Sequence, residues 1–322
     1  MKKYLKFSLP RFQEPAPSSF QTRPKRNGNT CLFACVFLIL LVSVETAFAD
    51  KAPQRIISMA PSITESLFAL GAGERVVGRT DFCKWPKEAC QLPNVGGMLN
   101  PSTETWLTLK PDLIIFLKSS DRLVSKAKSL GLNTLTVDMN RINSIFKSWK
   151  LMGDTLGIQD SAANLEHSIL KEIEFIKSKT RGLPKIETLL LLGDSSDPGR
   201  DLFAVGRSTF LGELIELAGG KNILEDPDAN YPRISKEFIL ARSPEVIIEA
   251  GPKSNLTGDE YKRRMKEWEP FSSIKAVQSK RIHFIGEDYA VIPGPRLHLI
   301  LKQFAQALHP DIFAGSSSTT KK

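Results

Sequence analysis

The sequence contains Glu104-Thr-Trp-Leu-Thr-Leu-Lys-Pro-Asp-Leu-Ile-Ile115, and the same pattern returns without a gap as Glu237-Phe-Ile-Leu-Ala-Arg-Ser-Pro-Glu-Val-Ile-Ile248. Each copy has a serine two residues before the glutamate, a proline seven residues after it, then an acidic residue and an apolar run. A second pair, Leu67-Phe-Ala-Leu-Gly-Ala-Gly73 and Leu214-Ile-Glu-Leu-Ala-Gly-Gly220, precedes these stretches in the same order. Two matches in one order indicate that the chain contains two copies of one architecture.

Around the first copy, short apolar runs alternate with helical patterns. Ser62-Ile-Thr-Glu65 has the capping-box spacing that opens a helix, and Gly71 and Gly131 are typical helix stops. We expect strands at 55–59, 76–80, 113–117 and 132–137, with helices at 62–71 and 121–130. This alternation predicts a mostly parallel sheet.

A connecting helix and a second alternating region follow. An apolar stripe predicts a helix over about 161–179, formed by Leu165, Ile169, Ile173 and Ile176. Beyond it we expect strands at 188–192, 246–249 and 281–285 and a last helix at 295–308. The prediction is an α/β fold of two Rossmann-like lobes, at 50–158 and 183–310, joined by a long rigid helix at 159–182, with a disordered tail at 311–322.

The first 49 residues have the features of a signal peptide. Residues 1–30 are polar and basic, and the apolar run from Cys31 to Val44 is shorter than the roughly 20 residues that span a bilayer. Ala47-Phe-Ala49 fits a signal peptidase site, so we expect cleavage before Asp50 and export of a soluble protein. An uncleaved anchor is the alternative.

Cleavage at that point leaves two of the four cysteines, Cys83 and Cys90. An oxidising compartment and a separation of seven residues favour a disulfide between them. Two unpaired thiols are the alternative, whereas a zinc site lacks a second pair of ligands nearby.

The charge of the chain gives little support to nucleic-acid binding. The net charge is +9, but the first 49 residues carry seven basic and two acidic side chains, which leaves +4 for residues 50–322. This excess is spread along the chain without a basic block, so we expect no nucleic-acid partner.

The sequence also gives little support to a metal-binding protein or a hydrolase. The four histidines lie eleven or more residues apart, at His167, His283, His298 and His309, and show no ligand spacing. No Gly-x-Ser-x-Gly elbow occurs, and Gly71-Ala-Gly73 lacks the third glycine of a dinucleotide site. We therefore expect neither a bound metal nor an enzyme.

Twin lobes leave a cleft between them, and small-molecule sites favour such interfaces. Motifs spread over residues 53–310 resemble the periplasmic solute-binding proteins of cobalamin and iron-siderophore ABC importers. They are Arg55-Ile-Ile-Ser-Met-Ala-Pro-Ser-Ile-Thr-Glu65, Leu67–Gly73, Gly78-Arg-Thr-Asp-Phe-Cys-Lys-Trp-Pro86, Val95-Gly-Gly97, Leu109-Lys-Pro-Asp-Leu-Ile114, Ala218-Gly-Gly220 and Pro293-Gly-Pro-Arg296. The resemblance implies a class III, helical-backbone binding protein: a periplasmic, monomeric carrier without a resident cofactor.

The resemblance also implies how such a carrier meets its importer. In this family each lobe presents one surface acid to an arginine pocket of the dimeric inner-membrane permease, and the motif positions are Glu104 and Glu237. An exposed carboxylate can accept a bidentate hydrogen bond from a guanidinium. The alternative is that each glutamate only interacts favourably with the N-terminus of its helix.

The ligand is expected on loops at the carboxyl ends of the strands. Aromatic and polar side chains at such positions are Phe82, Trp85, Met98, Phe203, Tyr231, Asp288 and Tyr289. Alignment to the family places five of them in the cleft, and two of these, Met98 and Tyr231, stand where cobalamin-binding members look to have tryptophan. Ordinary packing is the alternative for each residue.

Many aromatic rings on loops indicate a broad, flat, partly apolar cargo held by stacking. The Asp81-Phe-Cys83 and Trp85-Pro86 signature favours cobalamin or a related corrinoid. A ferric siderophore is the second candidate. Haem is a further one, since Tyr231 or Tyr289 could ligate its iron.

Overall fold

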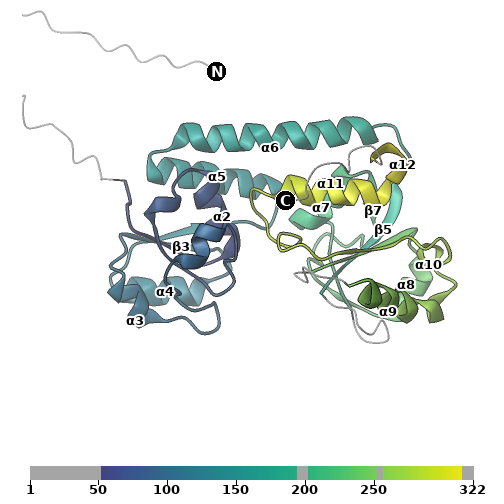
Figure 1. Cartoon of the computed structure of the whole chain (residues 1–322), viewed down its shortest axis with the longest axis horizontal. Coiled ribbons are helices and arrows are strands. Elements are labelled where there is room, and N and C mark those ends of the chain that lie inside the picture. The colour runs from purple at the N-terminus through teal and green to yellow at the C-terminus, as the bar shows by residue number, and fades with distance from the viewer. Residues whose placement is uncertain (1–51, 194–201, 252–256, 314–322) are drawn as a thin grey trace, which may run out of the picture. The chain divides into compact units, whose positions relative to one another are not determined.

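Two β-sheets, one from each half of the chain, form the framework of the protein (Figure 1). The structure is a computed structural model and describes residues 52–193, 202–251 and 257–313. In the first sheet the strands are ordered β2-β1-β3-β4 and every pair is parallel. Their bounds are β1 (Ile56–Ser58), β2 (Val76–Arg79), β3 (Leu113–Leu117) and β4 (Thr134–Val137). The four strands expected here are confirmed to within two residues at each end.

The second sheet is ordered β10-β9-β5-β6-β8, and β7 pairs with β5 beside this path. Its strands are β5 (Ile186–Leu192), β6 (Leu202–Ala204), β7 (Gly220–Asn222), β8 (Arg233–Ile234), β9 (Val246–Ala250) and β10 (Ile282–Ile285). Strands β10, β9, β5 and β7 run parallel, whereas β6 and β8 are antiparallel additions. Strands β6, β7 and β8 were not predicted, because strands of two or three residues have no measurable alternation.

Helices cover both sheets. They are α2 (Pro61–Ala69), α3 (Thr103–Thr108), α4 (Asp121–Ser129), α5 (Ile142–Leu156), α6 (Gln159–Thr180), α7 (Phe210–Leu217), α8 (Lys236–Arg242), α9 (Gly258–Trp268), α10 (Lys275–Gln278), α11 (Leu297–Leu308) and α12 (Pro310–Phe313). Short 3₁₀ helices lie at Gly73–Arg75, Lys87–Gln91 and Glu269–Phe271. No helix in the described ranges is long and apolar enough to cross a membrane.

Helix α6 connects the two halves and packs against α5, α7 and α11 (Figure 1). Its predicted stripe is confirmed, since Ile169, Ile173 and Ile176 are buried in one core that also contains residues of the other three helices. The lobe boundaries at 158 and 183 stay a prediction. Residues Asp311 to Phe313 were expected to be disordered but form α12, whose Phe313 is buried.

The predicted capping box at the start of α2 is wrong. The helix begins at Pro61 with Ala60 as its N-cap, and the N-cap side chain makes no hydrogen bond. Proline at the first helical position needs no N–H partner there and has its φ already set. Ser62 and Glu65 therefore lie inside the helix, and both are buried.

The internal repeat is reproduced in three dimensions. Asp112 accepts hydrogen bonds from the backbone N–H of Gln54 and of Arg55 at 2.7 and 2.9 Å, just before β1. Glu245 in the second copy accepts one from the N–H of Glu187 at 3.0 Å, at the start of β5. In both copies the acidic residue thus fixes the start of the neighbouring parallel strand, which explains why the two sequences share an acid there.

Candidate functional site

A buried arginine at the start of α11 joins the two halves of the chain. Arg296 is 8% exposed. Its Nε and Nη2 atoms donate to the two carboxylate oxygens of Glu65, on α2, at 2.9 and 2.5 Å. Its Nη1 atom donates to Asp288 at 2.8 Å. A bidentate guanidinium–carboxylate pair is directional as well as strong, so this arrangement fixes the orientation of the arginine.

Two aromatic rings lie against the same guanidinium. Its central carbon is 4.7 Å from the ring centroid of Trp85 and 5.1 Å from that of Tyr289. Both distances are typical of cation–π contacts. Three of the residues predicted to bind ligand, Trp85, Asp288 and Tyr289, therefore meet at Arg296. We call these residues together with Glu65 the Arg296 cluster.

A hydrogen bond to Tyr289 connects the cluster to α11. Its hydroxyl accepts from the side-chain amide of Gln303, on α11, at 3.0 Å. Burial, followed by the charge of Glu287, raises the pKa of Tyr289 to about 12. The phenol is therefore neutral at physiological pH.

Burial raises the pKa of Glu65 above its usual range, and the nearby charge of Asp288 adds to that shift. The hydrogen bond and the charge of Arg296 oppose it. Because the pKa is higher in the folded protein than in the unfolded chain, the folded state binds more protons between pH 4.5 and the raised pKa.

A pH dependence follows from this shift. The free energy of unfolding of the wild type, relative to that of Glu65→Gln, is expected to rise as the pH falls from neutral through the raised pKa of Glu65 towards 4.5. Urea unfolding of both proteins at a series of pH values measures the difference. A difference that stays constant or moves the other way contradicts the shift.

A second group of predicted ligand residues lies on the antiparallel edge of the second sheet. Phe203 on β6 is paired with Arg233 on β8, and the guanidinium carbon of Arg233 lies 5.1 Å from the centroid of the Phe203 ring. Phe203 is 46% and Tyr231 44% exposed. Burial raises the pKa of the Tyr231 hydroxyl, against a hydrogen bond with Thr209 that lowers it.

The remaining two predicted ligand residues, Phe82 and Met98, belong to neighbouring loops of the first half. Phe82 is 68% exposed and its ring lies against Gly97, where an added Cβ would come within 3.5 Å of it. Met98 and Leu99 follow and are also exposed. These loops therefore carry an exposed apolar edge that could contact a ligand.

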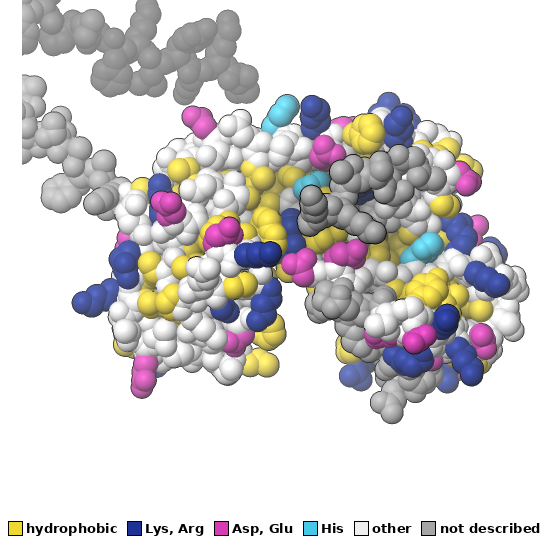
Figure 2. Space-filling view, viewed as in Figure 1, with side chains coloured by type: hydrophobic (Ala, Val, Ile, Leu, Met, Phe, Trp, Pro, Cys, Tyr) yellow, Lys and Arg dark blue, Asp and Glu magenta, His cyan; other side chains and the backbone are white. Residues whose placement is uncertain are grey.

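Figure 2 shows a hollow between the two halves, open on the side away from α6. A pocket of about 120 Å³ lies where β3 and β4 end, the edge that the crevice rule predicts. Its lining comes from both halves: Leu117, Lys118, Ser119, Asp138, Met139, Asn140, Phe210, Tyr231, Val291 and Pro293. Of the predicted ligand residues only Tyr231 lines this pocket. It is smaller than the roughly 300 Å³ at which small-molecule sites begin, so a large cargo would need the open hollow around it.

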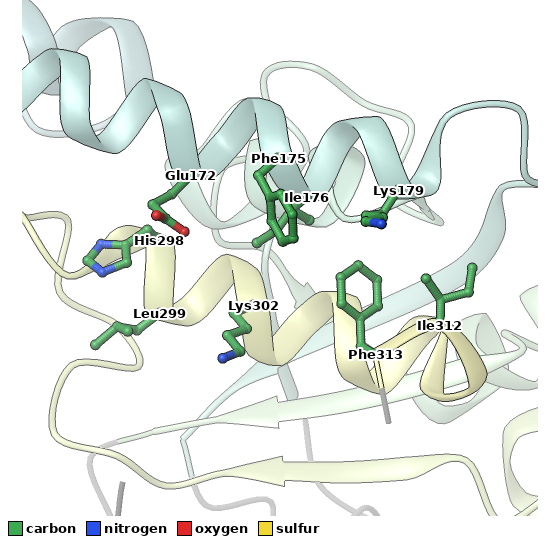
Figure 3. A pocket seen from close by; sticks show the side chains of 9 residues that line it. All are labelled: Glu172, Phe175, Ile176, Lys179, His298, Leu299, Lys302, Ile312 and Phe313. Atoms are coloured by element: carbon green, nitrogen blue, oxygen red, sulfur yellow. The ribbon is translucent and has the colours of Figure 1, made fainter. Parts of the chain in front are cut away.

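A different pocket, of about 420 Å³, lies between α6, α11 and α12 (Figure 3). Its apolar lining includes Phe175 and Ile176 of α6 and Ile312 and Phe313 of α12, with Lys179 and His298 also lining it. None of the predicted ligand residues lines it.

A second link between the halves lies at the start of α5. Glu213, on α7, accepts from Arg141 Nε at 2.7 Å and from the backbone N–H of Ile142 at 2.8 Å. The first turn of α5 is thus capped by a carboxylate from the other half of the chain.

The sequence patterns do not identify three residues that link the halves, Glu65, Arg296 and Glu213. Glu65 has the position of a capping residue in the predicted helix, and Arg296 stands at the end of a motif. A signal was present for Glu213, which stands between the buried Leu211 and Leu214. Local patterns cannot name the partner, because Glu65 and Arg296 are 231 residues apart.

The two predicted docking acids occupy equivalent places. Glu104 lies on α3 and Glu237 on α8, and both are exposed. A hydrogen bond from the Ser235 hydroxyl, followed by one from its own backbone N–H, lowers the pKa of Glu237, so this carboxyl is ionised at neutral pH.

Cys83 and Cys90, the cysteines within the described residues, are free thiols, so the predicted disulfide is not formed in this structure. Cys83 is buried, with its sulfur 3.0 Å from the Thr64 hydroxyl and 3.1 Å from that of Thr80. Cys90 is exposed and its thiol donates to the carbonyl of Lys84 at 3.2 Å. Within the described ranges no three histidine, cysteine, aspartate or glutamate side chains are grouped as a metal site.

Comparison with known proteins identifies the family. The model of the family described as "Periplasmic binding protein" matches residues 56–289. An uncharacterized ABC transporter substrate-binding lipoprotein, YvrC of Bacillus subtilis, is 29% identical over 82% of both chains. A vitamin B12-binding protein of Pectobacterium carotovorum is 25% identical over 83% of this chain and 92% of its own.

A solved structure has the same fold. The crystal structure of a possible iron-binding, periplasmic solute-binding protein of Staphylococcus epidermidis has a TM-score of 0.68 and 25% identity, over 80% of this chain and 100% of its own. The fold of this chain is therefore shared with a possible periplasmic solute-binding protein. The chain belongs to the periplasmic binding protein family.

Proposed function

We propose that the chain is the substrate-binding component of an ABC importer and that it captures cobalamin or a related corrinoid in the hollow between its halves. The observation that carries this proposal is the Arg296 cluster, in which Trp85 and Tyr289 are held against one guanidinium. Rings that are fixed before binding suit a broad, partly apolar cargo, because little side-chain entropy is lost on contact. The similarity to a vitamin B12-binding protein supports the same cargo.

A ferric siderophore or haem is the second candidate. The similarity to a possible iron-binding protein favours it, and the half-exposed Tyr231 and Tyr289 each offer a phenol oxygen that could ligate haem iron. Ligation by either would need the phenol to lose its proton, which the raised pKa values oppose.

Calorimetric titration with cyanocobalamin, with ferrioxamine B and with haemin tests the choice. We expect saturable binding of cyanocobalamin at one molecule per chain and no comparable heat with the others. Saturable binding of ferrioxamine B instead would transfer the assignment to siderophores. A Soret band on haemin titration that is lost in Tyr231→Phe or Tyr289→Phe would transfer it to haem.

In this proposal the chain acts outside the inner membrane as a carrier and not as a catalyst. Its predicted leader, residues 1–49, lies outside the described residues. Mass spectrometry of the exported protein tests the leader. A mass that begins at Asp50 supports cleavage, whereas the full-length mass would support an uncleaved anchor.

Glu104 and Glu237 are the proposed contacts with the permease. Replacing both with alanine is expected to leave the affinity for cargo in solution unchanged, because neither belongs to the Arg296 cluster or to the other predicted ligand groups, and to abolish uptake by cells that depend on this chain. Uptake at the wild-type rate would refute the docking assignment.

A further inference from the structure

The two repeats share few identical residues, and most of these have a structural role. The identities are Ser102 with Ser235, Glu104 with Glu237, Leu107 with Leu240, Pro111 with Pro244, Ile114 with Ile247 and Ile115 with Ile248. The isoleucines are completely buried in the sheets. Each proline follows a residue in the left-handed conformation, Lys110 at φ 46° and Ser243 at φ 41°, at the turn that leads into the strand.

Neither burial nor turn geometry accounts for the exposed glutamate and leucine. The inward side of each helix is occupied by Trp106 in α3 and Ile239 in α8, which are 0% and 2% exposed. Leu107 and Leu240, the next residues, are 47% and 40% exposed. A single exposed leucine is ordinary. The same exposed leucine at the same position in both copies, three residues after the same exposed acid, calls for a common cause.

In a helix, residues three apart lie side by side on one face. Each of the two helices therefore presents a carboxylate next to an apolar side chain. Figure 1 shows α3 and α8 both on the side of the described chain that lies away from α6. A partner that approaches this side would meet two copies of one contact.

We propose that Glu104 with Leu107, and Glu237 with Leu240, are two equivalent contact units for one partner, the dimeric permease. This inference rests on the proposed function and adds the chemistry of the permease surface. Each permease subunit would offer a cation for the carboxylate and, beside it, an apolar depression for the leucine. Two copies of one contact fit two copies of one subunit, since a symmetric partner presents the same patch twice.

The leucine has a physical reason to be in the contact. Exposed ion pairs alone contribute about 0–1 kcal/mol in water. An adjacent apolar side chain that is buried on docking excludes water from the ion pair and adds its own transfer free energy. The leucines therefore give the docking surface affinity that two exposed carboxylates alone would lack.

Binding of the exported chain to right-side-out membrane vesicles from its own organism tests the proposal. The test variant is Leu107→Ser with Leu240→Ser, and its matched control is Leu151→Ser with Leu170→Ser, which changes two leucines of similar exposure, 41% and 39%, on α5 and α6. We expect half-saturation of the vesicles to require roughly tenfold more of the test variant than of the wild type. The control, and Leu107→Met with Leu240→Met, should bind as the wild type does.

The role of the leucines would be overturned if the test variant half-saturated the vesicles at a concentration within twofold of the wild type while Glu104→Ala with Glu237→Ala lost binding. That result would leave the docking acids in place. Wild-type binding by the glutamate variant would overturn the docking assignment itself. Titration of every variant with cyanocobalamin separates these outcomes from a failure of the cargo assignment, because none of the changed residues lies in the Arg296 cluster.

Discussion

Glu65→Ala is expected to lower the free energy of unfolding by about 3 kcal/mol, because it leaves the guanidinium of Arg296 buried without its bidentate partner. The side chain of Glu65 is 1% exposed and that of Arg296 is 10% exposed, so water cannot take the place of the lost carboxylate without rearrangement. Asp288 still accepts one hydrogen bond from Arg296, which keeps the expected loss at the lower end of the range for broken buried pairs. Urea unfolding followed by circular dichroism measures the change.

Two further variants separate the ion pair from simple loss of volume. Glu65→Gln keeps an amide oxygen that can accept from Arg296 and removes a charge whose burial is unfavourable, so we expect a loss below about 1.5 kcal/mol. Glu65→Leu combined with Arg296→Met replaces both charges with apolar groups and is expected to be closer to the wild type than Glu65→Ala is. A loss below about 0.5 kcal/mol for Glu65→Ala, as for an ordinary surface change, would contradict the account.

Much of the fold can be read from the sequence because the central strands are buried on both faces. Strand β3 was predicted with its exact bounds, since Leu113 to Leu117 is an uninterrupted apolar run between polar residues. Helix α6 was predicted from its stripe of isoleucines. In both cases the local pattern and the tertiary burial agree, which is the condition under which sequence patterns are reliable.

In the helices and strands that were not predicted, the local sequence pattern does not match the burial in the folded protein. Helix α5 was not predicted, because asparagine, serine and glycine interrupt its pattern. Its buried face, with Ile145, Phe146 and Trp149, is recognisable once α6 is packed on it. The N-terminus of α5 is also capped from α7, by Glu213, and not by a residue next to it in the sequence.

The aromatic rings of the candidate site could be predicted from the sequence, but the arginine that holds them could not. Aromatic residues on loops pointed to Trp85 and Tyr289, since loops at the carboxyl ends of parallel strands carry ligand sites. What holds these rings is Arg296, whose partners come from residues 65, 85, 288 and 289. Such a cluster depends on how the two halves pack, and no local spacing encodes it.

Arg296→Gln is expected to weaken the binding of cyanocobalamin by roughly tenfold to a hundredfold, because two rings that are held before binding would have to be ordered on binding. The guanidinium lies within 5.1 Å of the centroids of both the Trp85 and the Tyr289 ring. Calorimetric titration measures the affinity. Arg264→Gln is the matched control, since Arg264 is also buried, has an ion pair with Glu249 and lies 5.0 Å from an aromatic centroid, but belongs to α9.

The tryptophans of the chain allow the cause to be tested without ligand. The sequence has four, and Trp106, Trp149 and Trp268 are at most 1% exposed, whereas Trp85 is partly exposed. Acrylamide quenching of tryptophan fluorescence therefore reports mainly on Trp85, and we expect it to increase in Arg296→Gln. A merely structural role would lower stability without a selective change in quenching. If Arg296→Gln showed unchanged quenching and wild-type affinity, Arg296 would not position the Trp85 ring. If quenching increased in Arg296→Gln but the wild type bound no corrinoid, the choice of cargo would be wrong.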